Sequence, residues 1–403
     1  MTIITTLSGN EMYCLAKKGF SAGNMVVGNS VYSLGLIRSL GAGFKAVLGG
    51  ELQQVTKLIE EGREVAYKRM VQEANEQNAT GITGVSSGLI FHPGNVEFLS
   101  IGSLIFTDNP NRKAQFSTSA TGQELYAQLD ANYRPICFAF GNVAYSIGLG
   151  RSFLGGLKTL VRGEIKEFSD IFNHTRHLAL QRIIDNAKKH NSNAVLGIKT
   201  LILPFSAANE MLMMGTASHA NFMSSGNEVV TSALTNIEMW NLAALGYAPM
   251  KLLLGTSVYS LGFFGSMTSF LKSFVRGEIP ELTKLIYGAR ENALDVIKAE
   301  AKSIGADDVF GVKTYVYQLG NGLIEFLAIG TAVKKMPELK TESEQLPPQA
   351  VTIDQDNFYD FASALTSVDV NRDYKRPAGN IFGGLMLIIV VTILVFWKIF
   401  FHN

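Results

Sequence analysis

Cysteine is scarce in this chain of 403 residues, which contains only Cys14 and Cys137. The two lie in apolar stretches, far apart along the chain, so the spacing expected of a disulfide framework is absent. The opening residues lead straight into polar turn residues and do not have the pattern of a cleavable secretory signal. We therefore expect reduced domains that face the cytosol.

A bias toward one sign of charge is also lacking. The chain has 35 basic and 34 acidic residues, a formal net charge of +1, and 17% charged residues in total. Nucleic-acid-binding surfaces are normally strongly basic, so no nucleic-acid partner is expected. The 47% of hydrophobic residues is enough to build several cores.

What the chain does contain is one motif repeated three times, with a period of roughly 113 residues. Residues 28–35, 141–148 and 255–262 all fit Gly-x-x-x-Tyr-Ser-x-Gly. Further residues recur at matching distances behind it: Gly50-Glu51, Gly163-Glu164 and Gly277-Glu278; Arg63, Arg176 and Arg290; and Gly84, Gly197 and Gly311. Glu97, Glu210 and Glu325 recur as well, with one extra residue before the Glu in the third copy. The period is too long for a solenoid unit, so each copy is predicted to be a small domain with its own core.

Each repeat has the pattern of an α+β unit. A short amphipathic helix precedes an apolar strand that runs into the glycine motif, and a long helix and two antiparallel strands follow. The order predicted is β-α-β-β, and the long helices are expected to end near Asn78, Asn191 and Gly305. Glycine-spotted apolar stretches at 36–48, 149–161 and 263–275 exceed what one helix and one sheet can bury. Repeats are therefore expected to pack on repeats, within and between chains.

The predicted boundaries follow from the repeats and from a change of composition behind them. The predicted segments are 1–110, 111–224 and 225–335 for the three repeats, 336–379 for a polar linker or stalk, and 380–401 for a transmembrane helix. In the stalk, Pro347-Pro348 and an acidic stretch favour a partly ordered linker. The aromatic cluster of Phe358, Tyr359 and Phe361 leaves open a brief helix docked on a domain.

The C-terminal segment is the one long apolar run. No charged residue occurs from Ile381 to Trp397, a length that matches the roughly 20 residues needed to cross a bilayer. Basic residues lie before it, at Arg372, Lys375 and Arg376, which places the three domains in the cytoplasm by the positive-inside rule. We expect a single-pass protein of the bacterial inner membrane with a C-terminal tail anchor. The alternative is an apolar helix docked in an oligomer's core.

Several motifs together resemble the YbjQ-like family of bacterial proteins, which is labelled heavy-metal-binding. These motifs are Gly-x-x-x-Tyr-Ser, then Gly-Gly-Glu or Arg-Gly-Glu, then Arg63-Glu64-Val65-Ala66 on a helix, then the strand opening at residues 305–312. The resemblance covers residues from near 5 to near 333. It implies small α+β domains of dodecin-like topology that assemble as pentamers. Two departures are the helical first segment and His177, which follows Arg176 where the other copies have Glu.

The metal label receives little support from the residues. Zinc sites need three or four Cys, His or carboxylate ligands, and no Cys or His recurs in all three copies. His174 and His177 are three residues apart on the second long helix and share a face, so they are weak candidates for a surface metal site. No cofactor-binding residue, catalytic residue or recurring nucleophile–base pair is predicted.

The recurring polar residues have structural interpretations. Glu51, Glu164 and Glu278 are placed in the first turn of the long helices, where a carboxylate favours the helix dipole. Arg63, Arg176 and Arg290 are expected to form ion pairs across repeat interfaces with Glu97, Glu210 and Glu325, with a ligand site as the alternative. The motif that contains Tyr32, Tyr145 and Tyr259 lacks the Lys of a phosphate-binding loop, which favours a tight turn over an anion cradle.

Two function classes remain. A non-enzymatic, membrane-tethered homo-oligomeric scaffold would form a ring- or cage-like assembly from the tandem domains. A module that binds metal or a small ligand is the alternative. Ligand chemistry should recur in every copy, whereas Gly, Tyr, Ser and apolar residues recur here, so the scaffold is favoured.

Overall fold

The computed structural model describes residues 2–33, 35, 50–109, 115–145, 163–205, 208–222, 228–260, 280–320 and 323–349. All of them belong to one compact unit, residues 1–357, and a second unit covers residues 358–403. The predicted membrane span at 380–401 and the glycine-spotted apolar stretches lie outside the described residues. Among the helices that are described, none is long and apolar enough to cross a membrane.

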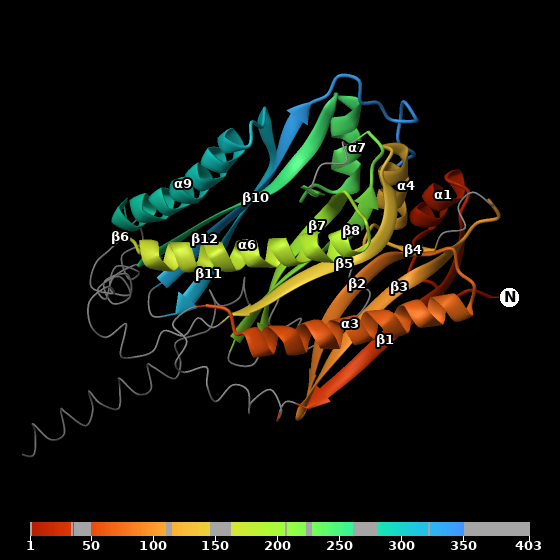
Figure 1. Cartoon of the computed structure of the whole chain (residues 1–403), viewed down its shortest axis with the longest axis horizontal. Helices are drawn as coiled ribbons and strands as arrows, with labels where there is room; N and C mark the ends of the chain where they lie inside the picture. The colour runs from red at the N-terminus through yellow and green to blue at the C-terminus, as the bar shows by residue number, and fades with distance from the viewer. Residues whose placement is uncertain are drawn as a thin grey trace, which may run out of the picture. The chain divides into compact units, whose positions relative to one another are not determined.

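The three repeats share one order of elements: a short helix, a long strand, a long helix and two long strands (Figure 1). The first has α1 (Gly9–Lys17), β1 (Ser21–Ser33), α3 (Gln53–Glu76), β2 (Gly81–His92) and β3 (Asn95–Phe106). The second has β4 (Phe116–Ser117), α4 (Gly122–Asp130), β5 (Arg134–Tyr145), β6 (Gly163–Glu164), α6 (Lys166–Lys189), β7 (Ala194–Phe205) and β8 (Ala208–His219). The third has β9 (Val230–Thr231), α7 (Asn236–Ala244), β10 (Tyr247–Ser260), α9 (Pro280–Ser303), β11 (Asp308–Gly320) and β12 (Leu323–Lys335). The predicted repeated α+β class is confirmed.

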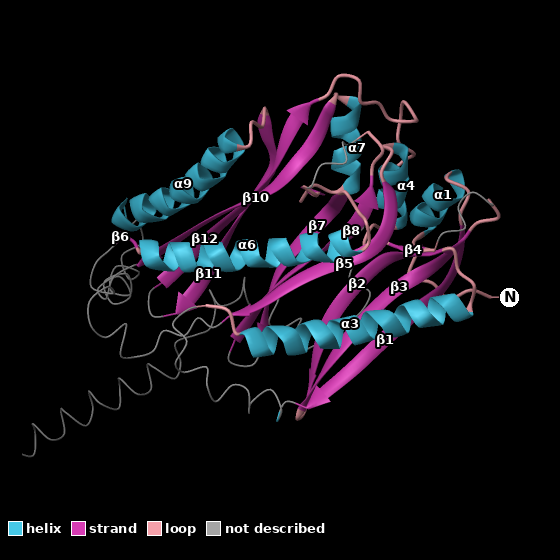
Figure 2. Ribbon diagram, viewed as in Figure 1, coloured by secondary structure: helices cyan, strands magenta, loops and turns pink. Residues whose placement is uncertain are grey.

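The strands form three sheets of four strands each (Figure 2). Their orders are β1-β3-β2-β4, β5-β8-β7-β9 and β11-β12-β10-β6, and the long strands pair antiparallel. The two-residue strands cross from one repeat to its neighbour. Thus β4 of the second repeat adds parallel to β2, β9 of the third adds parallel to β7, and β6 of the second adds antiparallel to β10. Each sheet is therefore completed by a neighbouring repeat.

The short helices begin at capping boxes. Ser8 with Glu11, Thr121 with Glu124, and Thr235 with Glu238 each satisfy two helix N-terminal amides reciprocally. Each helix is followed by a residue with positive φ, namely Gly19, Asn132 or Gly246. Glycine and asparagine tolerate this conformation, which ends a helix. The prediction of a short helix at this place is confirmed in all three repeats.

The long helices end at residues of the same kind. Asn78, Asn191 and Gly305 have φ of 53°, 55° and 68° and follow α3, α6 and α9. These are the positions at which the sequence predicted the helix ends. A second recurring glycine, Gly84, Gly197 or Gly311, has φ between 62° and 65° where the register of β2, β7 or β11 shifts. Glycine is needed at such a bulge because L side chains rarely adopt positive φ.

The glycine motif differs from its prediction, because its residues 28–33, 141–145 and 255–260 lie inside strands and form no tight turn. Gly28, Gly141 and Gly255 are in β1, β5 and β10. A Cβ on any of them would overlap the backbone of the long helix that crosses the strand, at Ala66, Ala179 or Ala293. The glycine therefore permits direct contact of helix and strand backbones. Sequence spacing does not reveal such an approach.

Candidate functional site: the interfaces between repeats

A buried ion pair joins the first repeat to the second. Arg63 on α3 donates from Nε to Glu210 Oε1 at 2.9 Å and from Nη2 to Glu210 Oε2 at 2.6 Å. Both side chains are fully buried. A third bond runs from Arg63 Nη1 to Ser87 Oγ at 2.9 Å. The bidentate geometry is the strongest form of the Arg–carboxylate contact, and it aligns the two repeats as well as attracting them.

The same contact joins the second repeat to the third. Arg176 on α6 donates from Nε to Glu325 Oε1 at 3.0 Å and from Nη2 to Glu325 Oε2 at 2.6 Å, and again both side chains are fully buried. The Arg176 guanidinium also lies over the Tyr145 ring, 4.5 Å from its centroid, and donates to the Tyr145 hydroxyl at 3.0 Å. Burial opposes the charge on Arg176, but the Glu325 carboxylate outweighs it and raises the pKa of the guanidinium.

The third Arg and the first Glu are not brought together. Arg290 on α9 is exposed, and no hydrogen bond or ion pair of its side chain occurs among the described residues. Glu97 on β3 accepts from Asn29 Nδ2 at 2.8 Å and lies 2.8 Å from His92 Nε2. These hydrogen bonds lower the pKa of Glu97, which keeps the carboxylate charged. Two of the three predicted pairs thus exist within the chain, each from one repeat to the next.

Apolar packing follows the same direction. Phe138 and Phe140 of the second repeat pack into one cluster with Met70 and Val85 of the first. Leu252, Leu254 and Val258 of the third repeat share a cluster with the helix and sheet of the second. Each of α3 and α6 therefore packs on its own sheet and on the first long strand of the next repeat. Such burial is the main favourable contribution to association.

The recurring glutamates before the long helices differ from their prediction. Glu51 and Glu164 precede α3 and α6, so neither is in the first helical turn. Glu51 bridges to Tyr145 of the second repeat and accepts from Arg182 Nη2 at 2.6 Å. Glu164 pairs with Tyr259 in the third sheet. Backbone pairing with the next repeat takes these residues out of the helix, and Glu278 lies outside the described residues.

The three motif tyrosines lie near the same interfaces. Tyr32 packs edge-on against Phe98, with ring centroids 5.7 Å apart, and remains partly exposed. Tyr145 and Tyr259 are buried. The Tyr259 hydroxyl accepts from Asn292 Nδ2 at 2.7 Å.

The two candidate metal ligands have other surroundings. His174 is exposed, and His177 Nδ1 lies 2.8 Å from the Asn173 carbonyl. His177 Nε2 is 3.8 Å from Glu300 Oε2 on α9, which in turn binds Lys251 at 2.8 Å. Within the described residues, no group of three or more His, Cys, Asp or Glu side chains could hold a metal ion.

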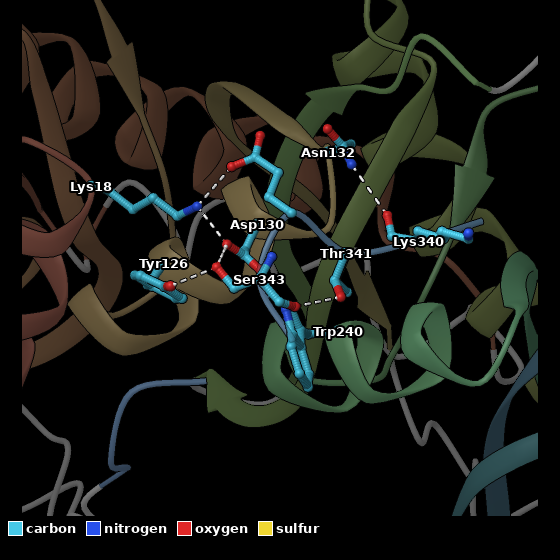
Figure 3. Close-up of polar contacts among 9 residues, drawn as sticks. Lys18, Tyr126, Asp130, Asn132, Trp240, Lys340, Thr341 and Ser343 are labelled. Carbon is cyan, nitrogen blue, oxygen red and sulfur yellow. Dashed lines mark hydrogen bonds and ion pairs between the residues drawn. The ribbon is translucent and has the colours of Figure 1, made fainter. Parts of the chain in front are cut away.

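A cluster around Asp130 was missed by sequence reasoning (Figure 3). Asp130 ends α4 and is fully buried; it accepts from Lys18 at 2.6 Å and from the Trp240 indole at 2.7 Å. Ser343 donates its amide and its hydroxyl to the same carboxylate, at 3.0 and 2.8 Å. Lys18 also lies over the Tyr126 ring, 4.7 Å from its centroid. Asp130 therefore connects all three repeats and the chain that follows them.

The start of the predicted stalk is part of this cluster. Leu339 is buried with α7, and Glu342 binds Lys18 at 2.9 Å. The helices α1, α4 and α7 contact one another in series. Residues 336–343 cover the contact between α4 and α7, where Lys340 bonds to Asn132 and Ser343 bonds to Asp130. No counterpart of Asp130 recurs, since Lys17 and Ala244 occupy its place in the other repeats.

Comparison with known proteins agrees with the repeated architecture. Residues 15–89, 132–221 and 247–336 match the model of the YbjQ-like family, described as "Putative heavy-metal-binding". The "Encapsulin nanocompartment protein Rv1762c" of Mycobacterium tuberculosis is 27% identical over 236 residues, which cover 56% of this chain and 87% of that protein. No solved structure gave a significant match.

Other relatives match a single shorter stretch of the chain. A "UPF0145 protein" of Colwellia psychrerythraea is 35% identical over 78 residues, 19% of this chain and 74% of its own length. Another, from Methanoregula boonei, is 40% identical over 84 residues, 21% of this chain and 70% of its own length. Because the three matched stretches make up more than half of its length, the chain belongs to the YbjQ-like family and carries three copies of the family domain.

Proposed function

We propose that this protein is a non-enzymatic scaffold that associates with copies of itself, in a ring- or cage-like assembly, and is tethered to a membrane. The observation that carries the proposal is the repeated interface. The chain forms the same buried Arg–Glu contact twice. The first repeat carries Glu97 and the third carries Arg290, and neither is used in such a contact within the described residues. The name of the mycobacterial relative, a nanocompartment protein, supports assembly as the role of such repeats.

The recurring residues also support a structural role. Arg63 and Arg176 each bind a carboxylate of the next repeat, so their charges serve to align neighbouring repeats. Gly28 and its counterparts permit helix packing. A dodecin-like topology and pentamers remain expectations from the family resemblance.

The membrane tether rests on the apolar run within residues 380–401 and its basic flank. Several anchors in one particle would bind a bilayer far more firmly than one, because the later contacts become intramolecular. The proposed orientation places the repeats in the cytoplasm of a bacterium. Flotation with liposomes tests the membrane anchor: the full chain should float, and a chain ending at residue 357 should not. Flotation of both would contradict the anchor.

The assembly is tested by the mass of the full chain in detergent, measured by multi-angle light scattering and imaged by electron microscopy. A particle of several chains is expected, and a single-chain mass would contradict the scaffold. Metal analysis of the same sample addresses the alternative, a module that binds metal or a small ligand. Stoichiometric metal would favour that alternative.

A further inference from the structure

We infer that the partner of each chain is a second copy bound head to tail, with Arg290 of one copy paired to Glu97 of the next. This rests on the proposed self-association and adds the surfaces and the register of the contact. Both pairs within the chain run in the same direction, from a long helix to the last strand of the following repeat. Of the three repeats matched in this sequence, Arg290 belongs to the last and Glu97 to the first, so neither has its partner among them.

The exposed apolar residues of α1 and β1 form what we call the leading face of the first repeat. Its five large side chains are Met12, Tyr13, Met25, Val27 and Val31, and they are exposed by 37–56%. Their counterparts in the second repeat are Leu125, Tyr126, Phe138, Phe140 and Ala144, and in the third Met239, Trp240, Leu252, Leu254 and Val258. All ten counterparts are exposed by 8% or less. The positions are thus buried wherever another repeat precedes them.

The opposite end has a matching trailing face on the third repeat. Val312 and Val316 on β11 are exposed by 43% and 49%. Their counterparts in the first repeat, Val85 and Leu89, are buried because the second repeat covers them. Arg290 on α9 is also exposed, whereas Arg63 and Arg176 are fully buried. The two faces are complementary halves of an interface that the chain already forms twice.

Strand addition supplies the register. The pairs that join neighbouring repeats place Phe116 beside Gly81 and Val230 beside Ala194. At the corresponding place before the first repeat are Ile3 and Ile4, exposed by 40% and 73%. The free outer strand is β11, where Asp308 and Val309 occupy the matching positions. Residues 3–4 of one copy therefore add parallel to β11 of another, a common mode of edge-strand recognition.

A head-to-tail contact has a consequence for stoichiometry. Heterologous interfaces close into rings or continue as open filaments. A closed ring of whole chains contains repeats in multiples of three, a condition that the five-repeat ring implied by the family resemblance does not meet.

Charge exchange in the full chain in detergent tests the contact. Each of the single variants Glu97→Arg and Arg290→Glu places two like charges, at positions 290 and 97, at the junction between identical copies. Each should therefore reduce the particle to single chains. Mixing the two variants makes every mixed junction complementary, so particles of several chains, in which the two variants alternate, should form again. The double variant Glu97→Arg/Arg290→Glu should also assemble. Asp295→Lys, an exposed charge reversal on the same helix, is the matched control and should leave the mass unchanged.

The outcomes separate this inference from the proposed function. Wild-type mass in both single variants would overturn the Glu97–Arg290 contact and leave the scaffold standing. A mixture that stays dissociated would overturn it as well, because a merely structural loss is not repaired by a second chain. Wild-type protein that is itself a single chain would overturn both. Circular dichroism of the single variants shows whether each remains folded.

Discussion

Trp240 donates its indole N–H to the Asp130 carboxylate at 2.7 Å across the boundary between the second and third repeats. Neither residue type recurs at the equivalent places in the other repeats, where tyrosines match Trp240, and Lys17 and Ala244 match Asp130. The contact is therefore particular to one junction. It is also the point at which Lys18 of the first repeat and Ser343 behind the third converge.

Replacing Asp130 by Asn should lower the urea midpoint of unfolding at pH 7, because the partly buried Lys18 ammonium loses its buried charged partner and keeps only the exposed Glu342. A loss of about 3 kcal/mol is expected, as for breaking a buried pair. Asp295→Asn, exposed on α9, is the matched control and should change nothing measurable.

The same carboxylate should make stability depend on acid. Burial raises the pKa of Asp130, but hydrogen bonds from Lys18, Trp240 and Ser343 outweigh it, and the net pKa is lowered. Its contribution is present above the unfolded pKa, about 3.9, and is lost as pH falls through the folded value. The wild-type midpoint should drop more than that of Asp130→Asn between pH 5 and pH 2, and parallel curves would refute this role.

Breaking the Arg176–Glu325 pair should lower the free energy of unfolding strongly, whereas replacing both residues by apolar ones should lower it only a little. Arg176→Met alone should destabilise the chain by about 3–5 kcal/mol, since Glu325 would remain buried and unpaired. Arg176→Met/Glu325→Leu should recover most of that loss, because both desolvation penalties disappear. A urea double-mutant cycle measures the coupling, and additive single effects would contradict the pair.

Gly255→Ala should be destabilising by at least about 1–3 kcal/mol, because a Cβ there overlaps the backbone of α9 at Ala293. Gly9 provides the matched control. It lies in the first turn of α1 with open space around it, so Gly9→Ala should be neutral or stabilising by less than about 1 kcal/mol. Thermal unfolding of both variants tests this prediction. Equal midpoints for Gly255→Ala and Gly9→Ala would contradict the close approach of the β10 and α9 backbones.

His177 should make the junction between α6 and α9 sensitive to pH near neutrality. The Glu300 carboxylate raises the pKa of His177 more than burial and Lys251 lower it. The stabilisation is therefore full below the unfolded pKa, about 6.5, and disappears as pH rises through the folded value. NMR titration should report a pKa above 6.5, and the thermal midpoint of His177→Gln should lack the decline of the wild type. A histidine pKa below 6.5 would contradict the contact.

The repeats, their α+β class and the helix ends could be predicted from the sequence because they depend on local signals. Asn78, Asn191 and Gly305 stop helices through their own backbone preferences. Recurrence also selected Arg63 and Glu210, although spacing alone does not tell which repeat supplies each partner.

What could not be predicted depends on contacts between distant segments. Gly141 resembles a turn residue until α6 is seen crossing it. Glu164 resembles a helix-dipole partner until its backbone pairs with β10. Asp130 escaped notice because comparing repeats finds only what recurs. The predicted membrane span and Glu278 lie outside the described residues and stay predictions.

Fusing three copies into one chain changes how the interfaces form. The two junctions with buried Arg–Glu pairs close within a molecule, at the high effective concentration that a covalent link provides. The contact that we propose between chains would, by contrast, depend on how much protein the cell makes. Dilution should therefore split a particle into intact triplets of repeats, so expression level would control the number of particles and leave the folding of each triplet unaffected.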